Sequence, residues 1–408
     1  MLSLTRLYNI GHGPSSSHTM GPIHAVEDFL SFYPALASYQ VILLGSLALT
    51  GKGHLTDQAV INAFAGRKVE VIFDYFQDLV HPNTMVILGF DKNEQVVDSF
   101  LYTSIGGGTI TRNGLLLELD TKVYPFKDFT AIKKYCLEEN ISLPTLVRRC
   151  ENQAGIEIER YLTKVWEQMK KTIQRGLKTE GVLPGKLALT RKAPHLHRLQ
   201  IPNEGVEARK ERHIFAYAYA TAEENAAGGI VVTAPTCGSS GVLPAVLYDQ
   251  HVRAGVSNAK IIEALMVAGV IGNTVKTNGS ISGAECGCQA EIGVAGAMAA
   301  SALAYISDLS IGQIEYAAEV MMEHHLGLTC DPVFGYVQIP CIERNAVVAV
   351  QAASVVLLAR HLYGSHRVSF DQMVVTMMET GRDMHVNYRE TAIGGLAKTL
   401  GEDYQKDK

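Results

Sequence analysis

The chain has 408 residues, of which 47% are hydrophobic and 19% charged, and this composition excludes a disordered protein and a collagen-like one. Its 36 basic and 41 acidic residues give a net charge of −5, too small to indicate a nucleic-acid or membrane partner. At roughly 100–200 residues per domain, the length predicts two domains, or at most three.

Neither the first residues nor the apolar runs indicate targeting to a membrane. Residues 1–6 lack a basic stretch followed by an apolar run. The longest apolar stretches, residues 293–306 and 346–359, fall short of the roughly 18–20 residues that span a bilayer. We therefore expect both stretches to form buried helices, and we expect a cytoplasmic protein without a membrane partner.

The first 130 residues mix helix and strand signals. Apolar periodicity predicts helices over residues 23–32 and 56–65. Short apolar or alternating runs predict strands over residues 39–44, 69–73, 85–90 and 95–102. A turn signal at residues 91–94 joins the last two strands as a hairpin. These elements predict a small α/β domain over residues 1–130.

From about residue 125 onward, helical periodicity dominates. Five apolar side chains fall on one face of a predicted long helix: Ile158, Leu162, Val165, Met169 and Ile173. Ala-rich segments follow at residues 216–227, 293–304 and 346–362. Small side chains allow close helix packing, so residues 131–408 predict an all-helical domain. The fold class is therefore predicted to be α+β.

Two polar loops of the first domain are candidate ligand sites. Residues 11–19 (GHGPSSSHT) place hydroxyls and free backbone N–H groups at a predicted helix start, an arrangement that binds anions such as carboxylates. Residues 49–57 (LTGKGHLTD) follow a predicted strand, and His54 stands there between a glycine and a helix start, where a general base fits. A serine-rich helix cap and a structural histidine are the alternatives that leave these loops without a function.

Two further loops carry weaker signals. Residues 104–109 (SIGGGT) fit a phosphate cradle, for instance for pyridoxal phosphate, and fit a simple turn equally well. No lysine stands in a recognisable Schiff-base context, so we do not predict that cofactor. Residues 233–241 (TAPTCGSSG) form a polar loop whose backbone N–H groups suit a substrate. Cys237 in this loop is a less favoured nucleophile, because no histidine lies nearby in the sequence.

The most specific signal comes from three cysteine-containing segments, residues 282–289 (SGAECGCQ), 329–332 (TCDP) and 340–345 (PCIERN). Pro332 and Pro340 are expected to keep two of the cysteines in loops. Thiolates presented among free N–H donors suit an iron–sulfur cluster. Zinc is the competing ligand, although no CxxC pair exists, and purely structural cysteines are the third reading.

The ordered set of motifs resembles the iron–sulfur-dependent L-serine dehydratases (L-serine ammonia-lyases) of the single-chain type. The likeness runs through residues 13–19, 47–57, 179–186, 224–229, 233–236, 280–289, 327–332, 339–345 and 388–391. It implies a β-domain similar to the serine-sensing domain of some phosphoglycerate dehydrogenases, joined to a helical catalytic domain. It also implies a [4Fe–4S] cluster held by Cys288, Cys330 and Cys341, with Cys286 as an extra thiol.

The resemblance implies β-elimination from L-serine to give pyruvate and ammonia, with an open iron acting as a Lewis acid. On this reading His54 takes the α-proton, with His18 as the second candidate. The expected substrate contacts are Ser15, Ser16, Ser17, Thr19, Lys52 and Thr236. The alternatives are the same chemistry on L-cysteine or L-threonine, or a serine-binding regulator with a structural cluster. We expect a small-molecule substrate, no nucleic acid, and a homodimer by base rate.

Overall fold

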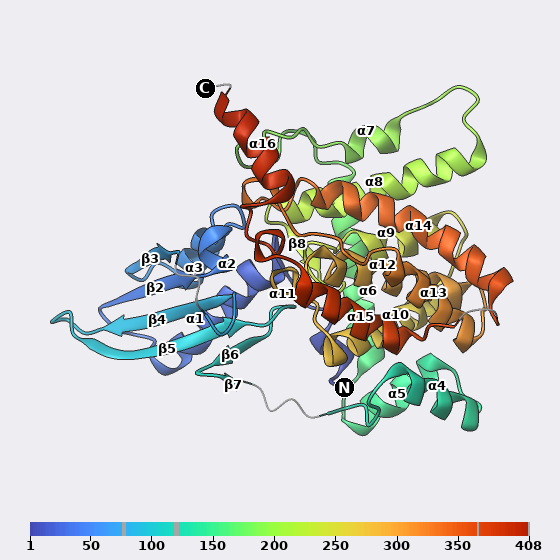
Figure 1. Cartoon of the computed structure of the whole chain (residues 1–408), viewed down its shortest axis with the longest axis horizontal. Coiled ribbons are helices and arrows are strands. Elements are labelled where there is room, and N and C mark those ends of the chain that lie inside the picture. Colours follow the sequence, from blue (N-terminus) through green and yellow to red (C-terminus); the bar gives the residue numbers. More distant parts are fainter. Residues whose placement is uncertain (76–78, 118–121, 365–366, 407–408) are drawn as a thin grey trace.

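The computed structural model describes residues 1–75, 79–117, 122–364 and 367–406. Figure 1 shows two bodies: a smaller one built on a sheet, and a larger one built from helices. The smaller body contains a six-stranded sheet, and nearly all regular structure after residue 129 is helical. The α+β fold class predicted from the sequence is confirmed.

The sheet has the strand order β3-β2-β4-β5-β6-β7. Its strands are β2 (Ser38–Leu44), β3 (Val69–Asp74), β4 (Thr84–Phe90), β5 (Val96–Ser104), β6 (Ile110–Arg112) and β7 (Leu115–Leu116). Strands β2 and β3 pair in parallel, whereas the other neighbours are antiparallel. A parallel pair needs a crossover, and here α3 (Thr56–Ala63) provides it.

One face of the sheet is buried by α1 (Gly21–Phe32) and α3. Burial alternates along β2, so that Tyr39, Val41 and Leu43 point into this core. They meet Phe29 of α1 and Val60 of α3. Short helix α2 (Ser46–Leu49) follows β2 directly, at the end of the sheet that faces the helical body.

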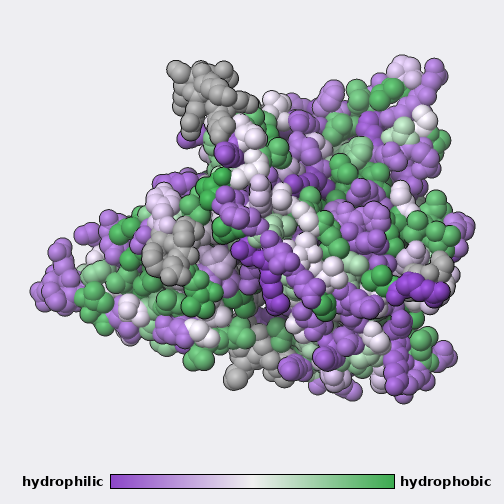
Figure 2. Space-filling model, viewed as in Figure 1, coloured by the Kyte–Doolittle hydropathy of each residue, from purple (hydrophilic) through white to green (hydrophobic). Residues whose placement is uncertain are grey.

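Parts of the sheet domain remain apolar at the surface. Figure 2 shows hydrophobic side chains among the polar ones at the sheet end of the molecule. The exposed large apolar residues of β5 and β7 are Val96, Val97, Leu101, Leu115 and Leu116. This surface contributes no residue to the cavity described in the next subsection.

The helical body is built around α12 (Ile292–Ile306), which packs against α9, α10, α13 and α14. Its larger helices are α5 (Leu143–Gln153), α6 (Ile158–Gly176), α8 (Val206–Ala226), α9 (Val242–Val252), α10 (Asn258–Asn278), α13 (Ile311–Glu323), α14 (Cys341–Leu362) and α15 (Phe370–Asp383). The others are α4 (Phe129–Glu138), α7 (Ala193–Arg198), α11 (Gly283–Cys286) and α16 (Gly395–Lys406). A Cβ at Gly296 of α12 would lie 2.7 Å from Met321 and 2.8 Å from Val348, so the small residue permits close packing.

The predicted amphipathic helix is confirmed as α6, and its five predicted apolar residues are at most 1% exposed. By length and composition alone, residues 288–306 and helix α14 are apolar enough to cross a membrane. The first of these segments is 83% buried among other helices and the second 39%. The first is therefore a core helix of the kind predicted, whereas α14 keeps a more exposed face than expected.

The chain's first residues pack with the helical body. Tyr8 donates its hydroxyl hydrogen to the Leu265 carbonyl at 2.9 Å, and the buried Glu151 accepts from the Leu4 N–H at 2.8 Å. Strand β1 (Ile10–His12) pairs antiparallel with β8 (Ile230–Val232), a strand that the expectation of an all-helical second domain missed. The loop after β1 therefore starts at the junction of the two bodies.

Candidate active site

A small cavity of about 20 Å³ lies at this junction. Pro14, Ser15 and His54 line it from the sheet side. From the helical side it is lined by Gly238, Cys288, Glu291, Cys330, Pro332, Val337, Cys341 and Glu390. All three predicted cysteine-containing segments and both predicted loops of the first domain thus reach the same cavity.

Three cysteines, Cys288, Cys330 and Cys341, face this cavity, and we refer to them as the cavity cysteines. Cys288 begins the 3-10 turn η3 (Cys288–Ala290), and Cys330 lies in the loop before η4 (Val333–Gly335). Backbone bonds fix that loop, because the Cys330 N–H donates to the Tyr388 carbonyl at 2.8 Å. Cys341 was expected to lie in a loop. In the structure Pro340 is the N-cap of α14, and Cys341 is the first residue of that helix.

The surroundings of Cys288 favour its thiolate. A hydrogen bond from the Cys330 thiol lowers the pKa of Cys288 to about 7, against the effect of burial and with help from the Arg344 guanidinium. Arg344 also donates to the Thr329 carbonyl at 2.6 Å, which fixes it next to the sulfur. A thiolate is the form that binds metal, so a cysteine with a lowered pKa, two neighbouring thiols and a fixed cation fit a thiolate-ligated cluster.

The extra thiol of Cys286 does not join the cavity cysteines. Its side chain is 1% exposed and packs against Met378, with Sγ 3.5 Å from Sδ. Burial raises the pKa of Cys286 to about 11, so this cysteine stays a thiol. Cys237 is equally buried, and burial raises the pKa of its thiol far above the usual value. Neither cysteine lines the cavity.

His54 is presented to the cavity by a tight loop after α2. A Cβ at Gly53 would lie 2.3 Å from the Gly335 backbone, so this glycine lets the loop approach the helical body. The Thr50 carbonyl accepts from the His54 backbone N–H and from its ring Nδ1, both at 3.0 Å. Because a carbonyl only accepts, Nδ1 carries hydrogen, and a neutral His54 has its lone pair on Nε2.

Glu390 faces that lone pair. Its Oε1 lies 3.4 Å from His54 Nε2 and 3.6 Å from His18 Nδ1, and the side chain is 6% exposed. Burial alone would raise the pKa of the Glu390 carboxyl, but its contacts with the imidazoles of His18 and His54 outweigh burial and lower it. Its second oxygen, Oε2, has no hydrogen-bond partner among the described residues. Glu390 thus supplies a buried negative charge beside His54.

His18 stacks on His54, with ring centroids 4.5 Å apart, but both of its nitrogens have other partners. Nδ1 is 2.8 Å from Ser17 Oγ and Nε2 is 3.0 Å from Ser46 Oγ. The Ser46 hydroxyl donates to the Glu390 carbonyl, so it must accept from His18 Nε2. Burial lowers the pKa of His18 to about 4, although Glu390 opposes it, and the ring is neutral at pH 7.

The other predicted contacts fall into two groups. Ser15 lines the cavity and caps the π-helical turn η2 (Ser16–Met20), in which Ser16 is buried. Thr19 donates to the His54 carbonyl at 3.0 Å and so holds the His54 loop. Lys52 does not reach the cavity: its side chain is 71% exposed and pairs with Asp57 at 3.1 Å.

The loop at residues 233–241 supplies Thr236 and Gly238. Thr236 donates its hydroxyl hydrogen to Glu291 Oε1 at 2.7 Å, and Gly238 lines the cavity. Burial raises the pKa of the Glu291 carboxyl well above its usual value, and the charges of Glu390 and Cys288 add to the effect. Thr236, a predicted substrate contact, therefore bonds Glu291, a cavity-lining residue that the sequence did not indicate.

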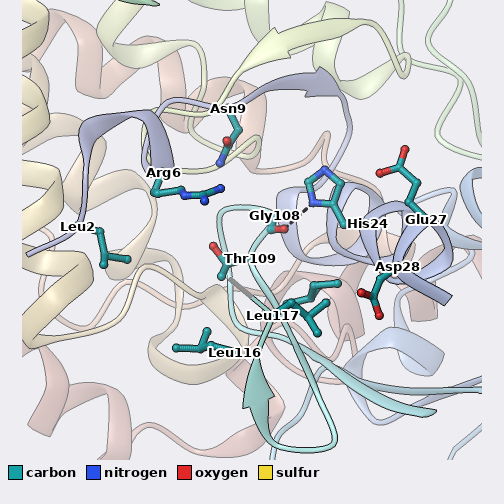
Figure 3. A pocket seen from close by; sticks show the side chains of 11 residues that line it. Leu2, Arg6, Asn9, His24, Glu27, Asp28, Gly108, Thr109, Leu116 and Leu117 are labelled. Atoms are coloured by element: carbon teal, nitrogen blue, oxygen red, sulfur yellow. Dashed lines mark hydrogen bonds between the residues drawn. The ribbon is translucent and has the colours of Figure 1, made fainter. Parts of the chain in front are cut away.

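The triple glycine lies at a different pocket, between the N-terminal segment, α1 and β6 (Figure 3). Gly106, Gly107 and Gly108 all have positive φ angles, 95°, 62° and 83°. Two of their carbonyls accept hydrogen bonds, Gly107 from Asn9 at 2.6 Å and Gly108 from His24 at 2.7 Å. In these contacts the glycine turn joins α1 and the N-terminal segment to the sheet.

Three residues of the site were missed by the sequence reasoning: Glu291, Arg344 and Glu390. Arg344 stands three residues after a cavity cysteine, as does Glu291, and helical or turn spacing would have suggested both. Glu390 lies in one of the segments that carry the family resemblance. Nothing in that segment indicated that His54 would have a buried carboxylate partner.

Two family models match the chain. The model described as "Serine dehydratase alpha chain" matches residues 128–397, and the one described as "Serine dehydratase beta chain" matches residues 3–80. The fold and these matches define the class: a helical body and a sheet body of the serine dehydratase type, joined in one polypeptide.

Curated relatives match over nearly the full length. L-serine dehydratase 2 of Escherichia coli (strain K12) is 40% identical over 453 residues, covering 98% of this chain and 99% of that protein. L-serine dehydratase of Streptomyces coelicolor is 40% identical with the same coverage, and that of Helicobacter pylori (strain J99) is 37% identical over 459 residues, covering 98% and 99%. The chain belongs to the serine dehydratase family, as its motifs predicted.

Proposed function

We propose that this protein deaminates L-serine to pyruvate and ammonia by β-elimination. Family membership supports this activity, because the relatives described above are named for it. The observation that carries the proposal is the convergence of the cavity cysteines, His54 and Glu390 on one cavity between the two bodies. That cavity combines a place for a Lewis acid with a place for a base.

We assign a [4Fe–4S] cluster to the cavity cysteines. Three soft ligands, with the Arg344 guanidinium beside them, suit an iron–sulfur cluster. No described cysteine offers a fourth thiol to this cavity. When bound, such a cluster supplies one iron without a protein ligand, which acts as a Lewis acid toward the hydroxyl and carboxylate of the substrate.

His54 is the proposed base, and its Nε2 accepts the α-proton. The Thr50 carbonyl holds Nδ1–H, so the basic nitrogen is the one at the cavity. Glu390 then stabilises the imidazolium that forms, and Thr19 keeps the loop in place through the His54 carbonyl. His18 is a positioning residue, because Ser17 and Ser46 occupy both of its nitrogens.

The loop of Ser15 is the proposed partner of the substrate carboxylate. Ser15 lines the cavity, whereas Ser17 acts through His18 and Lys52 points to solvent. Loss of the hydroxyl leaves aminoacrylate, which tautomerises and hydrolyses to pyruvate and ammonia without further help from the protein. The reaction involves no net redox change, so the enzyme needs no electron-transfer partner.

The test is an assay for ammonia and the 2-oxo acid, pyruvate from L-serine or L-cysteine and 2-oxobutyrate from L-threonine, with the iron-reconstituted protein under argon. L-serine should give equal amounts of both products, at a higher kcat/KM than L-cysteine or L-threonine. A preference for either of those amino acids would overturn the substrate assignment. A protein that binds L-serine and releases neither product would instead be a serine-binding regulator.

A further inference from the structure

Helix α14 carries an apolar face that no described element of this chain covers. The helix runs from the junction of the two bodies to the far end of the helical body (Figure 1). Its inner side packs against α8, α9, α12 and α13. On its outer side Val347 is 51% exposed, Leu357 59% and Leu358 37%. Residues 345–359 include no charged side chain, so this outer face has the composition of a buried contact.

A groove of about 410 Å³ adjoins the exposed face at Leu357. The side chains of α14 that line it are Ala349, Ala353, Val356 and Leu357, and residues of α8, α9 and α12 form the rest of its wall. The two alanines leave room beside the larger side chains. A stripe of apolar side chains next to such a groove is the surface on which a second helix packs.

The exposed side of α14 has a spacing that is self-complementary. Six partly or fully exposed residues follow one another at alternating intervals of four and three positions: Glu343, Val347, Val350, Ser354, Leu357 and His361. This spacing keeps side chains on the face of a helix that packs along another helix. The intervals read the same in both directions. In an antiparallel pair, Val347 of one copy therefore meets Leu357 of the other, and Val350 meets the small Ser354.

The polar groups at the two ends of the helix fit the same arrangement. Glu343 is 44% exposed, and its contact within the chain is with Lys192, at 3.7 Å between Oε1 and Nζ. An antiparallel copy places His361 and the exposed Arg360 next to this carboxylate, and a neutral imidazole already has an N–H to donate. The helix dipoles attract in this direction as well. A parallel copy would instead bring Glu343 against Glu343.

We propose that this face is the interface of a homodimer, in which two copies of α14 pack antiparallel across a two-fold axis that passes between Val350 and Ser354. The proposal gives a surface to the homodimer that was expected from base rates, and it does not depend on the proposed function. Each contact occurs twice, and the contact closes without leaving a second apolar face for further copies. A membrane is the other surface that suits so apolar a helix, but the ordered polar ends favour a second copy.

Sedimentation velocity of the iron-loaded protein under argon tests the dimer and its surface together. The wild type should sediment as a dimer. Leu357→Glu should raise the dimer dissociation constant by roughly 10²–10⁴-fold, because two buried leucine contacts are lost in each dimer. Leu137→Glu is the matched control: this leucine of α4 is 64% exposed and lies away from α14, and its substitution should leave the dimer intact.

Single cysteines test the antiparallel direction. Ser354→Cys places its thiol close to the two-fold axis, so a short bismaleimide should join two chains. His361→Cys lies about 27 Å from its copy along the helix at 1.5 Å per residue, and it should not be joined. Both variants are treated with their iron bound, at a concentration at which they sediment as dimers, and the wild type shows the background from native cysteines.

The contrary outcomes are distinct. A monomeric wild type, or a dimer that Leu357→Glu leaves as tight as before, would overturn the proposed interface. Cross-linking of His361→Cys as readily as of Ser354→Cys would overturn the antiparallel direction. Flotation of a monomeric wild type, but not of Leu357→Glu, with vesicles of phosphatidylcholine and phosphatidylglycerol would assign the face to a membrane instead. None of these results would alter the proposed deamination, which is measured separately.

Discussion

The contact between Glu390 and His54 provides the sharpest test of the proposed proton transfer. Glu390→Gln keeps the size of the side chain and removes its charge. With 3.4 Å between Oε1 and Nε2, the attraction of the carboxylate for an imidazolium is about 5 kcal/mol at an effective dielectric constant of ~20. About 1.4 kcal/mol corresponds to a factor of ten in rate. Complete loss of this attraction would therefore lower kcat by at most roughly 10³- to 10⁴-fold.

We expect a smaller loss, a fall in kcat of roughly 10²–10³-fold, because the amide dipole of glutamine retains part of the interaction. The assay is pyruvate release from L-serine under argon, normalised to the iron content of each preparation. Glu319→Gln is the matched control, since this glutamate is 2% exposed and lies outside the cavity. Iron-loaded Glu390→Gln that turns over at the wild-type rate would refute the assigned role of Glu390.

Three further predictions follow from other parts of the structure. His54→Ala should keep its iron and lose turnover by roughly 10²–10⁴-fold, the usual worth of a positioned base, and exchange of the α-deuteron of labelled L-serine should slow equally. Alanine at any of the cavity cysteines should abolish both the visible absorption and the activity, whereas Cys286→Ala and Cys136→Ala should keep both. Burial raises the pKa of Glu319 to about 7, so the folded protein binds its proton more tightly than the unfolded chain does, and stability falls as the pH rises from about 4.5 to 7. Glu319→Gln should therefore stabilise the protein at pH 8 by up to about 3 kcal/mol, and little at pH 5, as measured by urea unfolding.

Each of these predictions has an outcome that contradicts it. Wild-type deuteron exchange in His54→Ala would move the base elsewhere in the cavity. Loss of the absorption in Cys286→Ala but not in Cys288→Ala would show that the wrong cysteine was assigned. A stabilisation by Glu319→Gln that is equal at pH 5 and pH 8 would mean that titration of this carboxyl is not its cause.

The elements of the sheet body were predicted well because their signals are local. Alternation and apolar runs located β2 and β4 to within one residue. In the helical body, α6 was predicted in the same way, because its five apolar residues follow the helical period. The pairing of β1 with β8 was not predictable in the same way. These strands are three residues long and lie more than two hundred residues apart, so no periodic pattern marks them.

The candidate site was predictable where a residue type by itself suggests chemistry. Cysteines close to glycines or prolines and a histidine between a glycine and a helix start stand out, and Cys288, Cys330, Cys341 and His54 do line one cavity. Glutamates are common, and the local sequence does not indicate which of them belong to a functional site. Glu291 and Glu390 join the site only through burial and neighbours from distant segments, and Lys52 looked suitable in sequence but points to solvent.

The central claim is that L-serine deamination depends on an iron–sulfur cluster at the cavity cysteines. The most direct measurement follows iron content, acid-labile sulfide and pyruvate formation from L-serine on one preparation, before and after aerobic treatment with a chelator. We predict about four irons and four sulfides per chain at the start, loss of turnover in proportion to the iron removed, and recovery with ferrous iron, sulfide and a thiol under argon. Full turnover by iron-free protein would contradict the account.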